Sequence, residues 1–224
     1  MVEQIPLEEA VNKIEDGMTV MVGGFIGSGA PDQILELLAQ RGIKGLTLIA
    51  NDTGILGDAL SQLIVNRCFR KVIASHIGTN PETGKQMLAG ELEVQLVPQG
   101  TLVEQIRSAG AGLGGFLTPT GVATIVEEGK QKISIDHKEY LLELPLSADV
   151  ALLRAYKADP AGNLVYRRAA RNFNPVMATA AKTVIAQVEK IVPLGEIDPD
   201  EVMTPGIFVH YLVQARPKGV AQHG

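Results

Sequence analysis

The 224-residue sequence contains no tryptophan, only one cysteine and only 4% aromatic residues. The single cysteine, Cys68, can form neither an internal disulfide nor a cysteine-ligated zinc site, so we expect a small buried side chain in a reducing compartment. The four histidines are His76, His137, His210 and His223. They are far apart and lack the spacing of metal ligands, so we expect no metal site. The core has to be built from Val, Ile, Leu and Ala.

Concentrated charge and long apolar runs are also absent. The formal net charge is −5, and no block of Lys or Arg stands out. Nucleic acid binding needs concentrated positive charge, so we expect no nucleic-acid partner, although a small anionic ligand fits. No apolar run reaches the roughly 20 residues needed to span a bilayer, and the N-terminus lacks a signal-peptide pattern. The sequence therefore predicts a cytoplasmic protein that does not associate with membranes.

Short apolar runs alternate with helical patterns in the first half of the chain. The runs that predict buried strands are Thr19–Val22, Leu46–Ile49, Lys71–Ala74 and Leu92–Val97. The segments with helical spacing are Leu7–Ile14, Pro31–Ala39, Asp58–Val65, Glu82–Leu88 and Leu102–Ala109. This alternation predicts an α/β fold with an open, mainly parallel sheet and helices on both faces. Such sheets bind ligands at the carboxyl ends of their strands, here near Gly23, Ala50, Ser75 and Pro98.

The second half is less regular. Gly110 to Gly121 is rich in Gly and Pro, which predicts either an interdomain linker or a mobile loop over a site, and we favour the loop. Further strands are predicted at Glu139–Leu144, Val150–Ala155, Leu164–Tyr166 and Val184–Val188, with a helix at Pro175–Lys182. We expect residues 1–215 to form a single domain and residues 216–224 to form a flexible tail.

The sharpest local feature is a glycine-rich turn between a predicted strand and a predicted helix. It reads Gly23-Gly24-Phe25-Ile26-Gly27-Ser28-Gly29 and is followed by Pro31. Glycine permits positive φ, and the helix start would offer free N–H groups to a phosphate or pyrophosphate. The alternative is a tight turn without a ligand. The spacing fits neither the dinucleotide fingerprint, because Asp32 stands where a third glycine is required, nor the P-loop.

Two polar features lie further along the chain. Arg167, Arg168 and Arg171 form the densest basic cluster, which suits phosphate or carboxylate binding. The alternative, which we favour, is ion pairing with acidic residues in this chain or across a subunit interface. Asn172-Phe173-Asn174-Pro175 predicts a turn whose Asn caps the following helix. His76 follows a predicted strand and can approach the site, but we expect an ordinary hydrogen-bonded role for it.

The stretch from Asp16 to Pro31 resembles the signature of family I coenzyme A transferase alpha subunits. That signature has an acidic or amide residue, Gly, two free positions, three apolar residues, Gly-Gly-Phe, three free positions, Gly, a free position and Pro, and this sequence agrees at every defined position. Similar segments follow in order between about Leu7 and Val213. They are Leu46–Gly54, Gly90–Glu93, Pro98–Leu102, Ala109–Gly112, Thr118–Gly121, Tyr166–Asn174 and Val202–Ile207.

The resemblance implies one half of an α2β2 enzyme. Such enzymes move coenzyme A between an acyl-CoA and a carboxylate through a glutamyl-CoA thioester. Acetate, butyrate, acetoacetate, succinate and 3-oxoadipate all stay open as acyl groups, and we favour acetate with acetoacetyl-CoA or another short-chain acyl-CoA. The glutamate lies in a Ser-Glu-Asn-Gly segment of the beta subunit, and no Glu in this sequence is followed by Asn. The chain is therefore expected to be inactive alone. No tightly bound cofactor is implied, since coenzyme A is part of the substrate.

The resemblance also implies roles for particular residues. Gly23, Gly24, Phe25, Ile26, Gly27, Ser28 and Gly29 match the CoA-binding loop. Gln99 matches a glutamine of the oxyanion hole, and Asn51 matches an asparagine near the reacting carbonyl. Asp52 stands where fused animal forms have a second Asn, which speaks against a direct substrate role. Two alternatives stay open: a CoA- or nucleotide-binding sensor or scaffold without turnover, and a related acyl-CoA hydrolase or sugar-phosphate isomerase that works alone.

Overall fold

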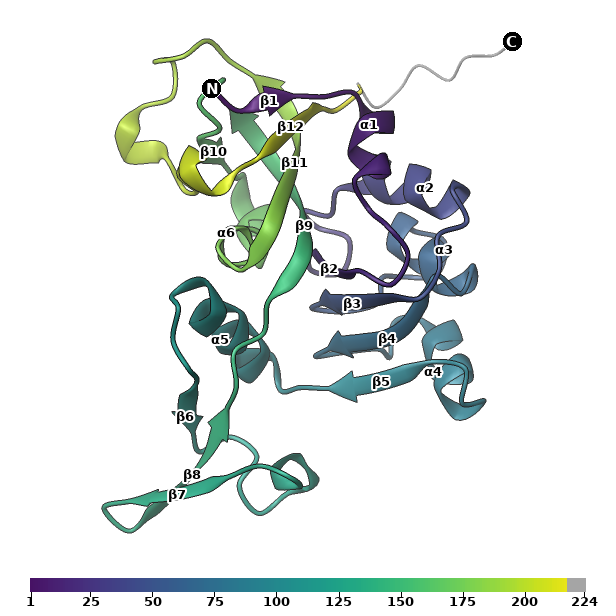
Figure 1. Ribbon diagram of the computed structural model, residues 1–224, viewed down its shortest axis with the longest axis vertical. Coiled ribbons are helices and arrows are strands. Elements are labelled where there is room, and N and C mark those ends of the chain that lie inside the picture. Colours follow the sequence, from purple (N-terminus) through teal and green to yellow (C-terminus); the bar gives the residue numbers. More distant parts are fainter. Residues whose placement is uncertain (217–224) are drawn as a thin grey trace.

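The computed structural model describes residues 1–216 of the chain. Its main body is a nine-stranded sheet in the order β1-β12-β11-β9-β2-β3-β4-β5, with β10 paired to β9 outside this path (Figure 1). All neighbours along this path are parallel, and β10 runs antiparallel to β9. The strands are β1 (Glu3–Gln4), β2 (Thr19–Val22), β3 (Leu46–Ala50), β4 (Phe69–Ala74), β5 (Glu93–Leu96), β9 (Ala148–Ala158), β10 (Leu164–Val165), β11 (Ala181–Ile191) and β12 (Tyr211–Gln214).

Side chains of the central strands alternate between two hydrophobic cores, as the two-residue period of a strand requires. In β2, Val20 and Val22 enter the core formed with α1, α2 and α3, whereas Met21 enters the core formed with α5 and α6. Figure 1 shows α1 to α4 on one side of the sheet and α5 and α6 on the other. The helices are α1 (Leu7–Asn12), α2 (Asp32–Gln40), α3 (Ala59–Val65), α4 (Pro81–Leu88), α5 (Gln99–Gly110) and α6 (Asn174–Ala178). The predicted α/β fold class is confirmed.

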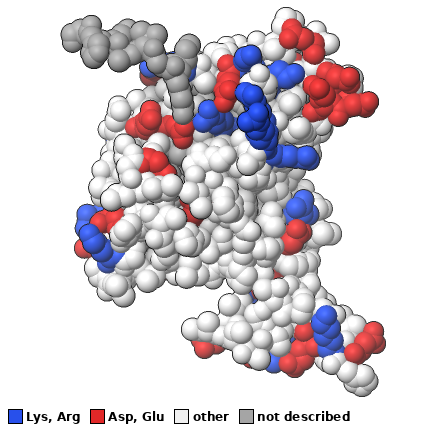
Figure 2. All heavy atoms as spheres, turned by 180° about the vertical axis from the view of Figure 1, so that it is seen from behind, with Lys and Arg blue, Asp and Glu red and all other residues white. Residues whose placement is uncertain are grey.

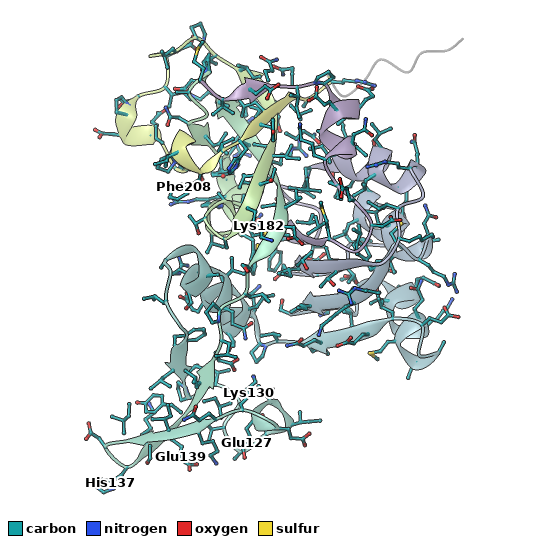
Figure 3. The ribbon with its side chains drawn as sticks, viewed as in Figure 1. Glu127, Lys130, His137, Glu139, Lys182 and Phe208 are labelled. Carbon is teal, nitrogen blue, oxygen red and sulfur yellow. The ribbon has the colours of Figure 1, made fainter. Side chains whose placement is uncertain are left out.

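A small three-stranded antiparallel sheet, which we call the arm, projects from the main body (Figure 1). It contains β6 (Phe116–Thr118), the 3₁₀ turn η1 (Ile125–Glu127), β7 (Lys132–Ile135) and β8 (Lys138–Glu143). The β7–β8 hairpin turns at Asp136 and His137, whose φ angles of +49° and +62° suit a two-residue turn. Figure 3 shows His137 at the tip of this hairpin. The arm thus ends in a tight, regular turn.

One buried carboxylate joins the arm to the main body. Glu143 is only 2% exposed. It accepts hydrogen bonds from Lys130 Nζ of the arm at 2.6 Å and from Gln105 Nε2 of α5 at 2.9 Å. Because a buried charge is costly without partners, this pair of contacts fixes where the arm leaves the body.

Several boundaries differ from the predictions. The predicted helix at Pro175–Lys182 is shorter, because α6 ends at Ala178 and β11 takes the chain from Ala181. The predicted strand at Glu139–Leu144 lies in the arm and not in the main sheet. The segment Gly110–Gly121 contains β6 and connects α5 to the arm.

The remaining short elements are three 3₁₀ turns, η2 (Arg168–Arg171), η3 (Pro199–Glu201) and η4 (Gly206–Phe208). Arg216, the first residue of the predicted tail, donates its N–H to Gln33 Oε1 at 2.9 Å and pairs with Glu8 at 2.8 Å. Residues 217–224 of that predicted tail lie outside the described residues.

We expect the thiol of Cys68 to be unreactive in the folded protein. Cys68 lies in the first core with no exposed surface, and burial raises the pKa of its thiol. Both effects lower the concentration of accessible thiolate, which is the reactive species. Labelling with a thiol-specific disulfide reagent should be slow in buffer and complete within minutes in denaturant. Rapid labelling of the folded protein would contradict this placement.

Candidate functional site

The polar residues that follow the central strands meet at one edge of the sheet. Strands β2, β3, β4 and β5 are adjacent and parallel, so Gly23, Asn51, Ser75 and Gln99 follow strands that end at the same edge. Gln99, the first residue of α5, donates its side-chain Nε2 to Asn51 Oδ1 at 2.7 Å. Two residues that are 48 positions apart are therefore in direct contact where the sequence analysis placed the site.

Asn51 and Asp52 form the buried floor of this site. They are 3% and 4% exposed. Asn51 Nδ2 donates to Asp52 Oδ2 at 2.8 Å. The Ser75 hydroxyl lies 2.8 Å from the Asn51 carbonyl oxygen and 3.0 Å from Asn51 Oδ1. Gln99, in contrast, is exposed, so the amide network runs from the interior out to solvent.

The glycine loop, residues 23–29, folds into a small closed ring over the end of β3. Phe25 and Ser28 exchange two backbone hydrogen bonds of 3.0 Å. Ile26 lies at φ +46°, a left-handed conformation that is unfavourable for a β-branched residue. Its N–H donates to Asp52 Oδ2 at 2.8 Å, which holds this strained turn against the floor.

Two asparagines clamp the other side of the glycine loop. Asn172 accepts from Gly24 N–H at 3.1 Å and donates to the Ser28 carbonyl at 2.8 Å. Asn174 donates to the Gly29 carbonyl at 3.0 Å. The predicted helix-capping role of this segment is wrong, because Asn174 lies inside α6 and neither side chain caps the helix. Nothing local in the sequence signals the clamp, since its partners lie about 145 positions away.

The same clamp explains why Gly23 has to be glycine. A Cβ atom at Gly23 would overlap Asn174 Oδ1. That oxygen already accepts the Arg154 N–H at 3.0 Å, and the Asn174 amide nitrogen also donates to Ala170 at 2.9 Å. The asparagine cannot move away without losing several hydrogen bonds.

The start of α2 does not offer the anion site that the sequence suggested. Gln187 Oε1, from β11, accepts the N–H groups of Gln33 at 3.1 Å and Ile34 at 3.2 Å. The other two N–H groups of the first turn donate to the carbonyls of Ala30 and Pro31. The carboxylate of Asp32 stands in the same turn, paired with Arg154 at 3.1 Å. The first-turn donors are occupied and a negative charge is in place, so a phosphate gains nothing there.

A ligand can only approach the glycine loop from its outer face. The cavity beneath the loop is small, with a volume of about 10 Å³, and has room for a single water molecule. The outer tip consists of Phe25, Ile26, Gly27 and Ser28, and the first two side chains are 42% and 41% exposed. The Gly27 N–H makes no hydrogen bond within the described part of the chain. The tip thus combines an apolar surface with a free backbone donor.

The basic cluster lines a separate groove of about 630 Å³. Arg167, Arg168 and Arg171 are exposed. Figure 2 shows Lys and Arg side chains near the top of the rear view of the molecule, beside Asp and Glu side chains. The favoured pairing within the chain is not found, because none of the three reaches a carboxylate among residues 1–216. Arg167 instead lies 5.4 Å from the centre of the Tyr156 ring. Tyr166 is buried with its hydroxyl 2.8 Å from Thr204, and burial raises its pKa.

Other candidates contribute less. His76 is exposed, and its imidazole has no hydrogen bond to the described residues, so the hydrogen-bonded role that we expected is not found. Within residues 1–216, no group of three or more His, Cys, Asp or Glu side chains could hold a metal ion. No helix in the same range is long and apolar enough to cross a membrane.

Comparison with known proteins identifies the family. The profile of the family described as "Coenzyme A transferase" matches residues 5–215. The chain belongs to the coenzyme A transferase family. It is 55% identical over 207 residues to the acetate CoA-transferase subunit alpha of Escherichia coli K12, an alignment that covers 92% of this chain and 94% of that one.

Other relatives of the coenzyme A transferase family agree with this match. The chain is 50% identical over 210 residues to the acetoacetyl-CoA:acetate/butyrate CoA transferase alpha subunit of Clostridium acetobutylicum, covering 94% of this chain and 96% of that one. The fold matches an acyl-CoA transferase from E. coli O157:H7, solved as a thioester complex with CoA, with a TM-score of 0.87 and 23% identity. All of this chain aligns with 49% of that structure, so it spans about half of the longer protein.

Proposed function

We propose that this chain is the alpha subunit of a heteromeric CoA-transferase. The enzyme moves coenzyme A between a short-chain acyl-CoA, such as acetoacetyl-CoA, and a carboxylate such as acetate. The observation that carries the proposal is the Gln99–Asn51 amide pair beside the glycine loop, at the carboxyl edge of the sheet. The high identity to alpha subunits whose names include acetate and acetoacetyl-CoA supports this substrate class.

The amide pair suits the chemistry of a thioester. A glutamate carboxylate of the partner attacks the acyl-CoA carbonyl and expels the CoA thiolate, which leaves an acyl-glutamyl anhydride. The thiolate then attacks the glutamyl carbonyl, releasing the first carboxylate and forming the glutamyl-CoA thioester, which the acceptor carboxylate opens in the same two steps reversed. Each tetrahedral intermediate carries an oxyanion. One hydrogen of Gln99 Nε2 is used by Asn51, and the second is available to such an oxyanion.

Coenzyme A meets the exposed tip of the glycine loop in this proposal. The apolar side chains of Phe25 and Ile26 provide a surface for the pantetheine arm, and the Gly27 N–H provides a donor for one of its amide oxygens or for the diphosphate. No cofactor beyond this substrate moiety is needed. Phe25, Ile26, Gly27 and Ser28 contact the ligand, while Gly23, Gly24 and Gly29 shape the loop.

The nucleophile and part of the site come from a beta subunit in an α2β2 assembly. Large apolar side chains are exposed in the segments that follow β2 and β3 and at the end of β5, namely Phe25, Ile26, Ile55, Leu56 and Leu96. Obligate subunit interfaces are larger and more apolar than ordinary surface, so this edge suits a permanent partner. The single buried thiol suits a cytoplasmic location.

Acyl-CoA exchange with and without the partner tests the proposal. The purified chain alone should show no exchange between acetoacetyl-CoA and acetate, and the chain co-expressed with a beta subunit should be active. Borohydride should inactivate the assembled enzyme only after incubation with acyl-CoA, and mass spectrometry should place the reduced glutamate on the beta chain.

Other outcomes would select another function. Thioester hydrolysis by the chain alone would indicate a self-sufficient hydrolase. Tight CoA binding without exchange in the assembled complex would indicate a sensor or scaffold. Exchange by the chain alone would mean that one of its own glutamates is the nucleophile.

A further inference from the structure

Asp52 is a buried carboxylate at the centre of the site that has no assigned part in the proposed reaction. It is 4% exposed and its oxygens receive three nitrogen donors. Oδ2 accepts from Ile26 N–H at 2.8 Å and from Asn51 Nδ2 at 2.8 Å, and Oδ1 accepts from Gly54 N–H at 2.9 Å. One side chain therefore holds both the tip of the glycine loop and the amide that contacts Gln99.

A carboxylate in this place decides which way two neighbouring amides face. An Asn or Gln side chain has a donor end and an acceptor end of nearly the same shape, so its orientation follows its partners. Asp52 as a carboxylate can only accept, so the NH₂ group of Asn51 has to face it. Asn51 Oδ1 then faces Gln99, so Gln99 has to donate a hydrogen bond to it from its own NH₂ group.

The other neighbours do not fix this orientation. The Ser75 hydroxyl beside Asn51 Oδ1 can rotate to donate or to accept. Gln99 is exposed, and Asn51 is its one hydrogen-bond partner among the side chains of the described residues. The direction of the whole chain of hydrogen bonds thus depends on its acceptor-only end at Asp52.

We infer that Asp52 is a positioning residue that sets the direction of the Gln99 amide and the place of the glycine-loop tip at the same time. This inference rests on the proposed function, because it assigns a purpose to the NH₂ group of Gln99. Asp52 acts through Asn51 and does not touch the substrate. Its carboxylate guarantees that a donor, and not a carbonyl oxygen, is presented where negative charge develops.

Asp52→Asn in the assembled enzyme removes the acceptor-only group while keeping its shape. The new amide can present its NH₂ group to Asn51, and Gln99 can then turn its oxygen toward the reacting carbonyl. An oxyanion-hole donor typically contributes 10²–10³ to kcat. In the variant the NH₂ group of Gln99 faces the reacting carbonyl in only a fraction of the molecules, so we expect kcat to fall about tenfold. An NH₂ group in place of Asp52 Oδ2 also faces the Ile26 N–H, so the loop tip loses this hydrogen bond and the acyl-CoA KM should rise about fivefold.

A double-mutant cycle with Gln99→Ala separates positioning from a general structural effect. Once Gln99 is absent, Asp52→Asn should lower kcat by less than about twofold, because it has no amide left to turn. Asp58→Asn is the matched control. Asp58 also lies after β3 and accepts two backbone N–H groups, Ile55 at 2.7 Å and Ser61 at 2.8 Å, but it makes no contact with Asn51. The kcat of the Asp58→Asn enzyme should equal that of the unmodified enzyme.

Equal losses from Asp52→Asn in both backgrounds, or an unchanged kcat in the single variant, would overturn the inference. So would a variant that fails to assemble, as judged by its sedimentation and thermal unfolding, because Asp52 would then serve the fold. A wild-type complex without exchange activity would instead sink the proposed function.

Discussion

Replacing Gln99 with Ala is expected to lower kcat about 10²- to 10³-fold and to leave the acyl-CoA KM within about threefold of its original value. Gln99 is exposed at the start of α5, and the second hydrogen of its Nε2 is free for the oxyanion. An oxyanion forms only as the carbonyl is attacked, so the contact strengthens in the transition state and acts on kcat. Steady-state kinetics of the assembled enzyme with acetoacetyl-CoA and acetate measure both constants.

Gln95 provides the matched control for that variant. It is an exposed glutamine on β5, four residues before Gln99, and its side chain has no hydrogen bond to the described residues. Gln95→Ala should keep full activity. If Gln99→Ala kept more than about a third of the original kcat, the oxyanion role would belong to another donor.

Gly23→Ala is expected to damage both stability and activity. The added methyl group overlaps Asn174 Oδ1, and moving that side chain breaks hydrogen bonds to Gly29, Ala170 and Arg154. Overpacking together with lost hydrogen bonds should cost about 2–4 kcal/mol. The thermal midpoint of the assembled enzyme should fall by roughly 5–15 °C. Loss of the loop geometry should also raise the CoA-substrate KM, measured in the same exchange assay.

Gly84→Ala is the control for this substitution. Gly84 lies inside α4, and a Cβ atom there meets nothing within 4 Å. Alanine at this helical position should therefore stabilise the protein by about 0.5–1 kcal/mol and leave activity unchanged. A Gly23→Ala enzyme as stable and active as Gly84→Ala would mean that the loop and its clamp can separate without consequence.

The alternation of strands and helices in the first half of the chain was predicted from the sequence. Strands such as Thr19–Val22 and Leu46–Ala50 are almost entirely apolar, because both faces of a parallel sheet are covered. The gathering of Asn51 and Gln99 also followed from the predicted parallel sheet, since β3 and β5, with β4 between them, end at the same edge. Short strands at the β1 end of the sheet were missed. Glu3–Gln4 and Tyr211–Gln214 have little pattern of their own and exist because each pairs with a neighbour.

The sequence could not predict contacts made by single polar side chains over long separations. Gln187 occupies the start of α2 from 154 positions away, and this overturned the expected phosphate site. Asn172 reads locally as a turn residue, yet it holds the glycine loop from about 145 positions away. Lone polar residues carry no periodicity, so only the folded chain shows which of them are partners.

The glycine loop has consequences for the thermodynamics of binding, because it is already ordered by Asp52 on one side and the two asparagines on the other. Fixing the backbone of a flexible residue costs about 1–2 kcal/mol of entropy. The seven residues of the glycine loop lose this entropy when the chain folds, so ordering the loop does not weaken substrate binding. Substrate association should therefore show a modest entropy change in calorimetry, and variants that loosen the clamp should bind with a larger entropic penalty.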